Sequence, residues 1–293
     1  MDERAALRLL GDRLDRAGDD AAVVDGTVVT TDMLHETTDF PAGTTRYTAG
    51  WRAVGASLSD VAAMGARATA AVAVYGAPSF DADELGAFVD GACDVCAAVG
   101  TEYVGGDLDG HEEFTVATTA LGETDAPVRR SGARPGDALC VTGTLGRSAA
   151  ALELFGEGDL ERANELFRFT PRVADGVALA PHATAMMDSS DGLARSLHQL
   201  AEASGCGFDV EASSLPVDPA VLDVAGDTRE ARGMARTFGE DFELVCTVPP
   251  GRLGAAREGC PTDLVRVGET TDGGVRLDGE PLPDEGWTHG ERG

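Results

Sequence analysis

The sequence predicts a two-domain protein that combines an α/β part with an α+β part. The chain has 293 residues, which suits one large domain or two modest ones. Strand-like and helix-like segments alternate in both halves, as they do in layered α/β and α+β folds. Residues 123–137 are loop-like and contain the turn sequence Pro135-Gly136-Asp137. We place the domain boundary there, with an N-terminal domain over residues 1–125 and a C-terminal domain over residues 126–293.

The first half begins with a helix predicted over residues 4–16, because its leucines share one side at helical spacing. β-branched residues predict a strand over residues 27–34. Many small residues in the helix predicted over 45–65 imply close packing. The other elements predicted in this half are a strand over 68–75, a helix from Asp83 to about residue 99 with Asp83 as its cap, and strands near 102–104 and 114–121.

The second half begins with a strand predicted over residues 138–142. The glycine-rich run Gly143–Gly146 then leads into a helix through residue 155. This run is either a phosphate cradle at a helix N-terminus or a tight strand-to-helix turn. The other elements predicted here are a helix from Pro171, a helix from residue 192 to about 203, and strands over 183–187, 208–210, 242–248, 264–267 and 274–277.

The charge balance excludes several classes of function. The chain has 51 acidic and 23 basic residues, a net charge of −28, and every basic residue is an arginine. Without lysine, there can be no Schiff-base lysine, no Walker-type lysine and no protein-kinase lysine. A field this negative also argues against nucleic acid or an anionic membrane as the main partner.

The acidity is spread along the chain, which leaves two interpretations open. One is adaptation to a salt-rich cytoplasm, where the repulsion between carboxylates is screened. The other is acidity that serves to bind a partner. No apolar stretch is long enough for a transmembrane helix, and residues 1–10 lack the apolar core of a signal peptide. The six cysteines are too irregularly spaced for a disulfide scaffold, so we expect a cytoplasmic protein.

Aspartates recur where predicted strands and helices end, next to Gly, Ser or Thr. Open α/β sheets bind ligands at such ends. Several carboxylates that meet there repel one another unless hard cations bridge them, and Mg²⁺ takes such oxygen ligands together with substrate phosphates. Each aspartate taken alone has a simpler interpretation as a helix cap or a turn residue. The positions are Asp19-Asp20, Asp32, Asp60, Asp107, Asp188 and Asp191.

Eight short motifs, in order along residues 18–245, together resemble those of the thiamine-monophosphate kinases. This family belongs to the aminoimidazole-ribonucleotide-synthetase (PurM-like) superfamily. Four motifs lie in the first half: Gly18-Asp19-Asp20-Ala21-Ala22, Thr30-Thr31-Asp32-Met33-Leu34, Ser57-Leu58-Ser59-Asp60 with its continuation to Gly65, and Gly105-Gly106-Asp107. The other four are the segments over residues 130–137, 141–146, 188–193 and 239–244.

The resemblance implies a PurM-like fold and a homodimer whose N-terminal sheets form the interface. It implies transfer of the γ-phosphoryl group of ATP to thiamine monophosphate, which yields thiamine diphosphate and ADP. The Mg²⁺ ligands that it implies are Asp20, Thr30, Thr31, Asp32, Asp60, Asp107, Asp188 and Asp191. The implied ATP contacts are Gly106, Asp107, Arg130 and Ser190, and the implied catalytic residues are Asp107, Arg130 and Asp191.

The substrate side has three candidates. By resemblance, Glu240 and Trp287 match positions that contact thiamine, and Asp39 stands where the family commonly has a histidine. The residues are consistent with this reaction even when the resemblance is left aside, because the phosphate acceptor is already largely ionised and needs no strong base. Two crowded phosphate chains must instead be brought into line, and cations held by carboxylates, together with Arg130, would offset their repulsion.

Two alternatives stay open at this stage. Within the superfamily the cyclo-ligase shares the aspartate-rich ATP site, but the motifs at 30–34 and 239–244 look more like those of the thiamine kinases. A different class is a non-catalytic protein that binds nucleotides or divalent ions. Loss of ATP turnover on substitution of Asp107, with the fold intact, separates an enzyme from such a binder.

Overall fold

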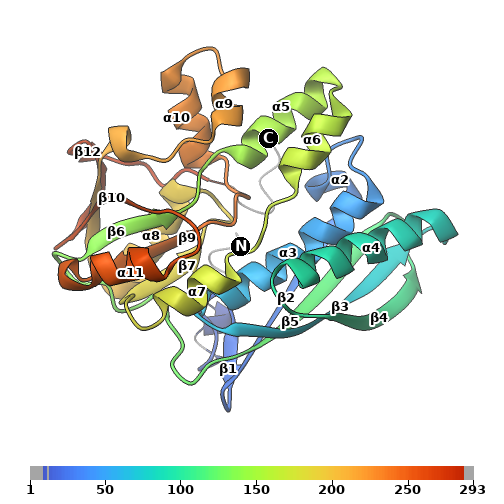
Figure 1. The fold of residues 1–293 in the computed structure, drawn as a ribbon, viewed down its shortest axis with the longest axis horizontal. Coiled ribbons are helices and arrows are strands. Elements are labelled where there is room, and N and C mark those ends of the chain that lie inside the picture. Colours follow the sequence, from blue (N-terminus) through green and yellow to red (C-terminus); the bar gives the residue numbers. More distant parts are fainter. Residues whose placement is uncertain (1–8, 12, 287–293) are drawn as a thin grey trace.

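Two β-sheets, one in each half of the chain, organise the computed structural model, which describes residues 9–11 and 13–286 (Figure 1). The N-terminal sheet has the strand order β1-β2-β5-β3-β4, and the C-terminal sheet has the order β12-β11-β8-β10-β6-β9-β7. The predicted combination of an α/β part and an α+β part is therefore confirmed. No helix within the described ranges combines the length and the apolar character that crossing a membrane requires.

The N-terminal sheet is mostly antiparallel, and only its β3 and β4 strands run parallel. Helices α3 and α4 lie across one of its faces in Figure 1. A short helix, α2, follows the second strand directly. The bounds are β1 Ala22–Val24, β2 Thr27–His35, α2 Glu36–Asp39, α3 Arg46–Ala63, β3 Arg67–Ala77, α4 Ala82–Ala98, β4 Tyr103–Gly110 and β5 Thr115–Glu123.

Helices α3 and α4 pack with their backbones in close approach, as the small residues of the predicted helix implied. A Cβ atom on Gly50 would lie 2.1 Å from the Phe88 carbonyl oxygen, and one on Gly91 would lie 2.0 Å from that of Tyr47. Such distances leave room only for glycine. The cap of α4 was predicted wrongly: Asp81, not Asp83, accepts hydrogen bonds from the first-turn amides, because it has the extended backbone of an N-cap residue.

The face of the N-terminal sheet opposite α3 carries exposed apolar side chains. Met33 on β2 is 56% exposed and Val74 on β3 is 42% exposed. The strand register places both in one row with Ala117 and Asp107. We call this surface the outer face of the N-terminal sheet, defined by Thr31, Met33, Val74, Asp107, Ala117 and Leu121. Whether it forms a dimer interface stays a prediction.

The C-terminal sheet is antiparallel except where β8 and β11 pair in parallel. Its strands are β6 Ala138–Thr142, β7 Ala185–Asp188, β8 Gly207–Val210, β9 Leu244–Val248, β10 Leu264–Thr271, β11 Gly274–Leu277 and β12 Glu280–Pro281. The helices of this half are α5 Arg147–Glu157, α6 Leu160–Phe167, α7 Val173–Leu179, α8 Leu193–Ser204, α9 Pro219–Val224, α10 Thr228–Thr237 and α11 Leu253–Gly259.

One hydrophobic cluster joins the two halves. It contains Leu58 from α3 and Met64 directly after it, together with Met186, Leu244 and Cys246 from the C-terminal sheet. Helix α3 is therefore in contact with both sheets. The division at residues 125/126 stays a prediction.

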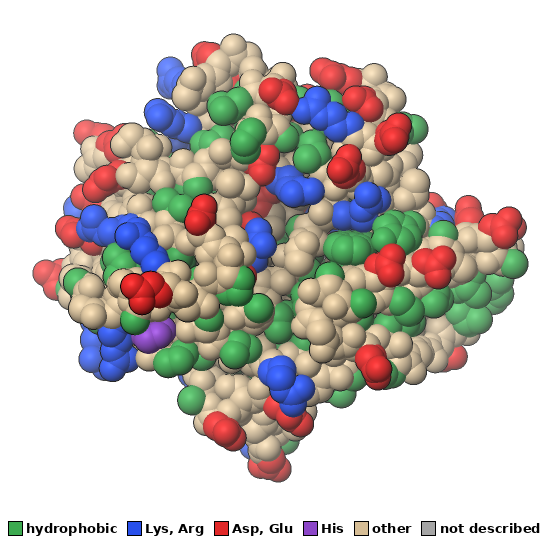
Figure 2. Space-filling view, viewed as in Figure 1, with side chains coloured by type: hydrophobic (Ala, Val, Ile, Leu, Met, Phe, Trp, Pro, Cys, Tyr) green, Lys and Arg blue, Asp and Glu red, His purple; other side chains and the backbone are tan. Residues whose placement is uncertain are grey.

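Acidic side chains are dispersed over the face of the molecule shown in Figure 2, and arginines lie among them. Many arginines of the described residues form ion pairs, as Arg162 does with Asp223 and Arg67 with Glu123. The surplus of carboxylates is thus a property of the whole visible surface rather than of one patch. This distribution agrees with the spread of acidic residues along the sequence.

Candidate active site between the two sheets

Helix α3 carries polar side chains that reach toward both halves of the protein. Arg52 contacts the C-terminal half, whereas the Ser57 hydroxyl donates a hydrogen bond to Asp32 on β2 (2.6 Å). Ser59 donates to the carbonyl oxygen of Phe242 (3.4 Å), and Asp60 follows it. Arg52 and Asp60 are eight residues apart, which is about 12 Å along a helix. The site is built along this length of α3.

Three carboxylates from different parts of the chain meet near the C-terminal end of α3. Asp20 comes from the turn before β1, Asp60 from α3, and Asp188 is the last residue of β7. One ligand oxygen of each lies within 4.8 Å of the others. We call this group the carboxylate cluster. Three of the aspartates predicted to bind Mg²⁺ are thus brought together by the fold.

The carboxylate cluster is electrostatically strained. Burial raises the pKa of Asp188 to about 7, and the charge of Asp20 adds to this effect. Burial and the neighbouring aspartates raise the pKa of Asp60 well above its usual value. Oδ2 of Asp188 is buried and has no hydrogen-bond partner among the residues that the structure describes. Such an arrangement is suited to a hard divalent cation, which takes carboxylate oxygens as ligands and removes their repulsion.

Thr30 and Asp32 extend the cluster along the inner side of β2. The Thr30 hydroxyl donates to Asp60 Oδ2 at 2.5 Å. Burial raises the pKa of Asp32, and the hydrogen bond from Ser57 opposes that rise. Ser57 also lies 2.7 Å from the hydroxyl of Thr118 on β5. This chain of hydroxyl groups orients the carboxylates next to the cluster.

Arg130 supplies the positive charge beside the cluster. Its Nε and Nη2 donate to the two oxygens of Asp20 at 3.1 and 2.9 Å, which is a bidentate pair. Its backbone N–H donates to Asp19, and Arg129 pairs with the same carboxylate. The loop that follows β5 is thereby fixed to the turn before β1. Arg130 was predicted to contact ATP, and this role stays a prediction.

Two loops of the C-terminal half lie against each other next to the cluster. The Glu240 amide donates to the Ser190 carbonyl oxygen (2.6 Å), and the Ser189 amide donates to that of Glu243 (2.8 Å). These bonds join the segment after Asp188 to the segment over residues 239–243. Glu240 and Phe242 have φ angles of 55° and 53°, which non-glycine residues rarely adopt. The predicted strand therefore begins at Leu244 rather than at residue 242.

A cavity of about 960 Å³ is lined in part by Glu240. All of the charged residues that line it within the described part of the chain are acidic, and apolar side chains such as Phe40, Phe167 and Phe238 form much of the rest. We call it the acidic cavity. The carboxylates that line it are Asp39, Glu153, Glu230, Glu240 and Glu285. Two of the three residues predicted on the substrate side, Asp39 and Glu240, therefore share one cavity.

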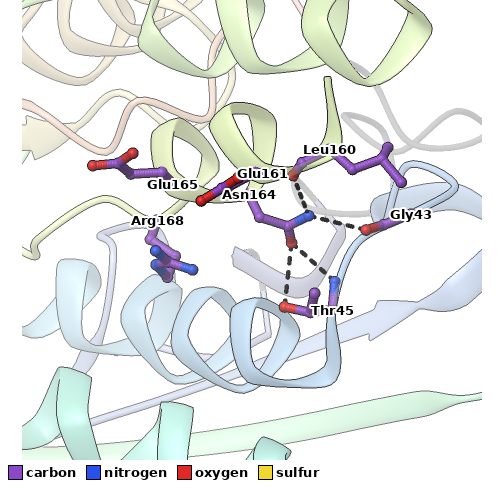
Figure 3. Close-up of a pocket in the computed structure, with 7 residues that line it drawn as sticks. All are labelled: Gly43, Thr45, Leu160, Glu161, Asn164, Glu165 and Arg168. Atoms are coloured by element: carbon purple, nitrogen blue, oxygen red, sulfur yellow. Dashed lines mark hydrogen bonds between the residues drawn. The ribbon is translucent and has the colours of Figure 1, made fainter. Parts of the chain in front are cut away.

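A second, smaller depression of about 400 Å³ lies beside α6 (Figure 3). Asn164 occupies its centre and forms hydrogen bonds with three residues in two segments. Its amide nitrogen donates to the carbonyl oxygens of Gly43 and Leu160, and its oxygen accepts from the Thr45 amide. These bonds fix the loop before α3 to α6. The same loop continues from the Asp39–Ala42 wall of the acidic cavity.

The structure does not bring every predicted site residue to the cluster. The register pairs Asp107 on β4 with Val74, on the outer face of the N-terminal sheet, and Thr31 lies on that face too. Three strand spacings separate β2 from β4, which is about 14 Å. Gly106 packs against β3, since a Cβ there would lie 1.7 Å from the Ala73 carbonyl oxygen.

The remaining predicted residues belong to the loop after Asp188 or lie beyond the described part. Ser190 is partly buried next to the 239–243 segment, and Asp191 lies 3.9 Å from Arg195. Trp287 lies outside the described residues. The sequence interpretation missed Arg52, which contacts Glu240. The sequence feature that could have pointed to Arg52 is its charge, because it lies within a predicted helix over 45–65 that is rich in small residues.

Comparisons with known proteins identify relatives of both halves of the chain. Residues 18–124 match the family AIR synthase related protein, N-terminal domain, and residues 134–279 match its C-terminal domain. A thiamine-monophosphate kinase of Halobacterium salinarum is 67% identical over 99% of this chain and 100% of its own length. One of Methanospirillum hungatei is 38% identical over 99% of both chains.

The fold of the whole chain has a matching solved structure. The structure of AaThiL complexed with AMPPCP and TMP has a TM-score of 0.88 and 28% identity, over 98% of this chain and 97% of that one. The match covers both halves of the protein. The two family matches and the identity to full-length relatives lead to one conclusion: this chain belongs to the thiamine-monophosphate kinases, a family of the AIR synthase related proteins.

Proposed function

We propose that the protein transfers the γ-phosphoryl group of ATP directly to the phosphate of thiamine monophosphate, as the last step in making thiamine diphosphate. One observation carries the proposal. Glu240 of the acidic cavity donates its amide hydrogen bond to Ser190, which is two residues after Asp188 of the carboxylate cluster. A phosphate-handling site is thus next to a cavity suited to a cation. The relatives named as thiamine-monophosphate kinases support this assignment.

The residues at the cluster fit divalent cations, which we propose to be Mg²⁺. Carboxylate oxygens are ligands of the kind that Mg²⁺ prefers, and one buried oxygen of Asp188 has no hydrogen-bond partner within residues 9–11 and 13–286. When bound, the ions would offset the negative charge of the two phosphate chains. The proposed ligands nearest the cluster are Asp20, Thr30, Asp32, Asp60 and Asp188, and the further ones predicted are Thr31, Asp107 and Asp191.

The protein's own residues position the phosphates in this proposal. Arg130 lies at the cluster with a rigid fork of N–H donors that matches phosphate oxygens. Ser190 lies in the loop after Asp188, and its carbonyl oxygen accepts a hydrogen bond from the Glu240 amide. Because the acceptor is an ionised phosphate monoester, no strong general base is required. Alignment of donor and acceptor for in-line transfer then supplies much of the rate enhancement.

The acidic cavity is the proposed site for the thiamine part of the acceptor. Thiamine carries a permanently cationic thiazolium ring, and a cavity lined by carboxylates and phenyl rings attracts such a group. Asp39, at the end of α2, and Glu240, in the segment over residues 239–243, both provide negative charge in the lining. The proposal predicts a marked preference for thiamine monophosphate over uncharged sugar phosphates.

The proposal includes a homodimer formed through the outer face of the N-terminal sheet. Exposed Met33 and Val74 give this face an apolar character, and Asp107 lies in the same row. In such a dimer Asp107 faces the second subunit rather than the cluster of its own chain. This placement is consistent with a role for Asp107 at a site completed by two subunits.

Product formation tests the proposed reaction. Purified protein is incubated with ATP, MgCl₂ and thiamine monophosphate in molar KCl, and thiamine diphosphate is measured by chromatography after oxidation to thiochrome. We expect product only when all three components are present, and none with free thiamine as the acceptor. Folded protein that forms no product would contradict the substrate assignment.

A further inference from the structure

Arg52 is a buried cation where α3 meets the C-terminal half. Arg52 is only 2% exposed. Nη2 donates to Glu240 Oε2 at 2.8 Å, and Nη1 donates to the Phe167 carbonyl oxygen at 2.6 Å. The guanidinium carbon also lies 3.5 Å from the centroid of the Phe167 ring. These contacts hold the guanidinium group in one position.

The partner of Arg52 belongs to a segment with an unfavourable backbone. Glu240 has a φ of 55°, and Phe242 has one of 53°. Such conformations persist only where the surroundings fix them. The Glu240 amide donates to Ser190, and its carbonyl oxygen accepts from the Ser148 hydroxyl at 2.7 Å. Arg52 adds a hydrogen bond to the Glu240 carboxylate, so both the side chain and the backbone of Glu240 are fixed by hydrogen bonds.

We propose that Arg52 is a positioning residue for thiamine monophosphate, which holds the Glu240 carboxylate in the wall of the acidic cavity. The inference rests on the proposed function and adds a residue to it. Arg52 is not among the residues that line the cavity, whereas Glu240 is. Arg52 therefore reaches a ligand there through the residues that it contacts, which are the Glu240 carboxylate and Phe167 of the cavity lining, and the Glu240→Gln background separates the two routes.

Two effects of Arg52 on a cationic ligand have opposite signs. Its positive charge weakens the attraction of Glu240 for a cation, and its hydrogen bond orders the carboxylate. The strained segment makes the ordering effect the larger one, because without Arg52 the Glu240 side chain loses a bond that keeps it at the cavity wall. The direction of the change in affinity therefore distinguishes the two effects.

The test is a double-mutant cycle between Arg52→Met and Glu240→Gln. KM for thiamine monophosphate, KM for ATP and kcat are measured for wild type, both single variants and the double variant. We expect Arg52→Met to raise KM for thiamine monophosphate by about tenfold or more, the size of a lost hydrogen bond between charged groups. KM for ATP should change less than about twofold, and in the Glu240→Gln background Arg52→Met should add little.

Two further variants keep the test decisive. Arg52→Lys retains the charge and should recover part of the affinity, and it carries the test if Arg52→Met does not fold. Arg168→Met is the matched control, because Arg168 also joins the C-terminal half to α3, through Thr48 and the Tyr47 ring, without lining the acidic cavity. It should leave KM for thiamine monophosphate unchanged. Circular dichroism reports folding for each variant.

Binding of thiamine monophosphate, measured by calorimetry without ATP, separates the possible failures. Wild type that neither binds nor phosphorylates it would contradict the proposed function and this inference with it. Wild type that does both, with additive effects in the cycle, would contradict the inference alone. Arg52→Met that binds thiamine monophosphate as tightly as wild type, or more tightly, would also overturn it.

Discussion

At the scale of single residues, the site combines groups whose charges oppose folding. Asp60 and Asp188 lie close together with raised pKa values, and burial is the main cause for each. Arg130 offsets part of this cost through its bidentate pair with Asp20. Functional sites commonly hold carboxylates in this way, because a positively charged ligand stabilises them when it binds.

Asp60→Asn should affect stability and function in opposite directions. Removing one carboxylate relieves repulsion in the cluster, so the melting temperature of metal-free protein should rise. The same change removes a proposed Mg²⁺ ligand, and turnover should fall by about a hundredfold or more. Thermal denaturation in EDTA and the thiochrome assay measure the two effects. Equal activity of this variant and wild type would exclude Asp60 as a ligand.

The raised pKa of Asp188 predicts a pH dependence of stability. In the unfolded chain its pKa is near the usual 3.8, and in the fold it is about 7, so the folded state binds the proton more tightly. Its contribution to stability is therefore fully present below pH 3.8 and is lost as the pH rises through about 7. Urea midpoints of metal-free protein from pH 5 to 8 should fall more for wild type than for Asp188→Asn. Parallel curves would contradict this assignment.

At the scale of elements, helix α3 connects the two sides of the site. Arg52 contacts Glu240, whereas Asp60, two turns later, joins the carboxylate cluster. The glycine-rich run before α5 is a tight turn whose amides are already used. The Asp241 carboxylate accepts from the amides of Gly146 and Ser148. Of the two interpretations of that run, the structure therefore supports the turn.

Close packing of α3 on α4 can be tested at Gly50. In Gly50→Ala the new Cβ would lie 2.1 Å from the Phe88 carbonyl oxygen, so the helices must move apart. We expect the free energy of unfolding to fall by about 1–3 kcal/mol. The control is Gly86→Ala on α4, which meets open space and should gain about 0.5–1 kcal/mol in helix stability. Urea denaturation measures both, and equal effects would contradict close packing as the cause.

At the scale of the whole molecule, two features are open to experiment: assembly and charge. The outer face of the N-terminal sheet exposes apolar side chains in a row with Asp107. The net charge of −28 is spread over the chain. Both features concern how the protein interacts with its surroundings rather than how it folds locally.

Val74→Asp should convert the proposed dimer into monomers, because it places a charge within the apolar outer face. Sedimentation velocity measures the change in mass. Val89→Asp on α4, which lies on the helical side of the N-terminal sheet, is the control and should leave the assembly intact. Wild type that sediments as a monomer at high concentration would contradict the proposed interface.

The acidity of the surface predicts stabilisation by salt. Molar KCl screens the repulsion among carboxylates, so the urea midpoint should be higher there than at low ionic strength. Equal midpoints in the two conditions would count against salt adaptation and favour acidity as a device for binding a partner.

The sequence by itself determined the chemistry available to this protein. It established the absence of lysine, the aspartates at element ends, the order of strands and helices, and the motifs that resemble a known family. These properties are local: each depends on residues that are neighbours along the chain. Periodicity and turn residues predicted most of the elements around the site for the same reason.

Only the tertiary structure decided which of these residues meet. Asp20, Asp60 and Asp188 form one cluster, Asp107 lies on another face, and Arg52 pairs with Glu240 across 188 positions of sequence. Such contacts depend on how two sheets pack around α3. Strand register and helix packing arise from the whole core, so no local pattern specifies which distant carboxylate faces which arginine.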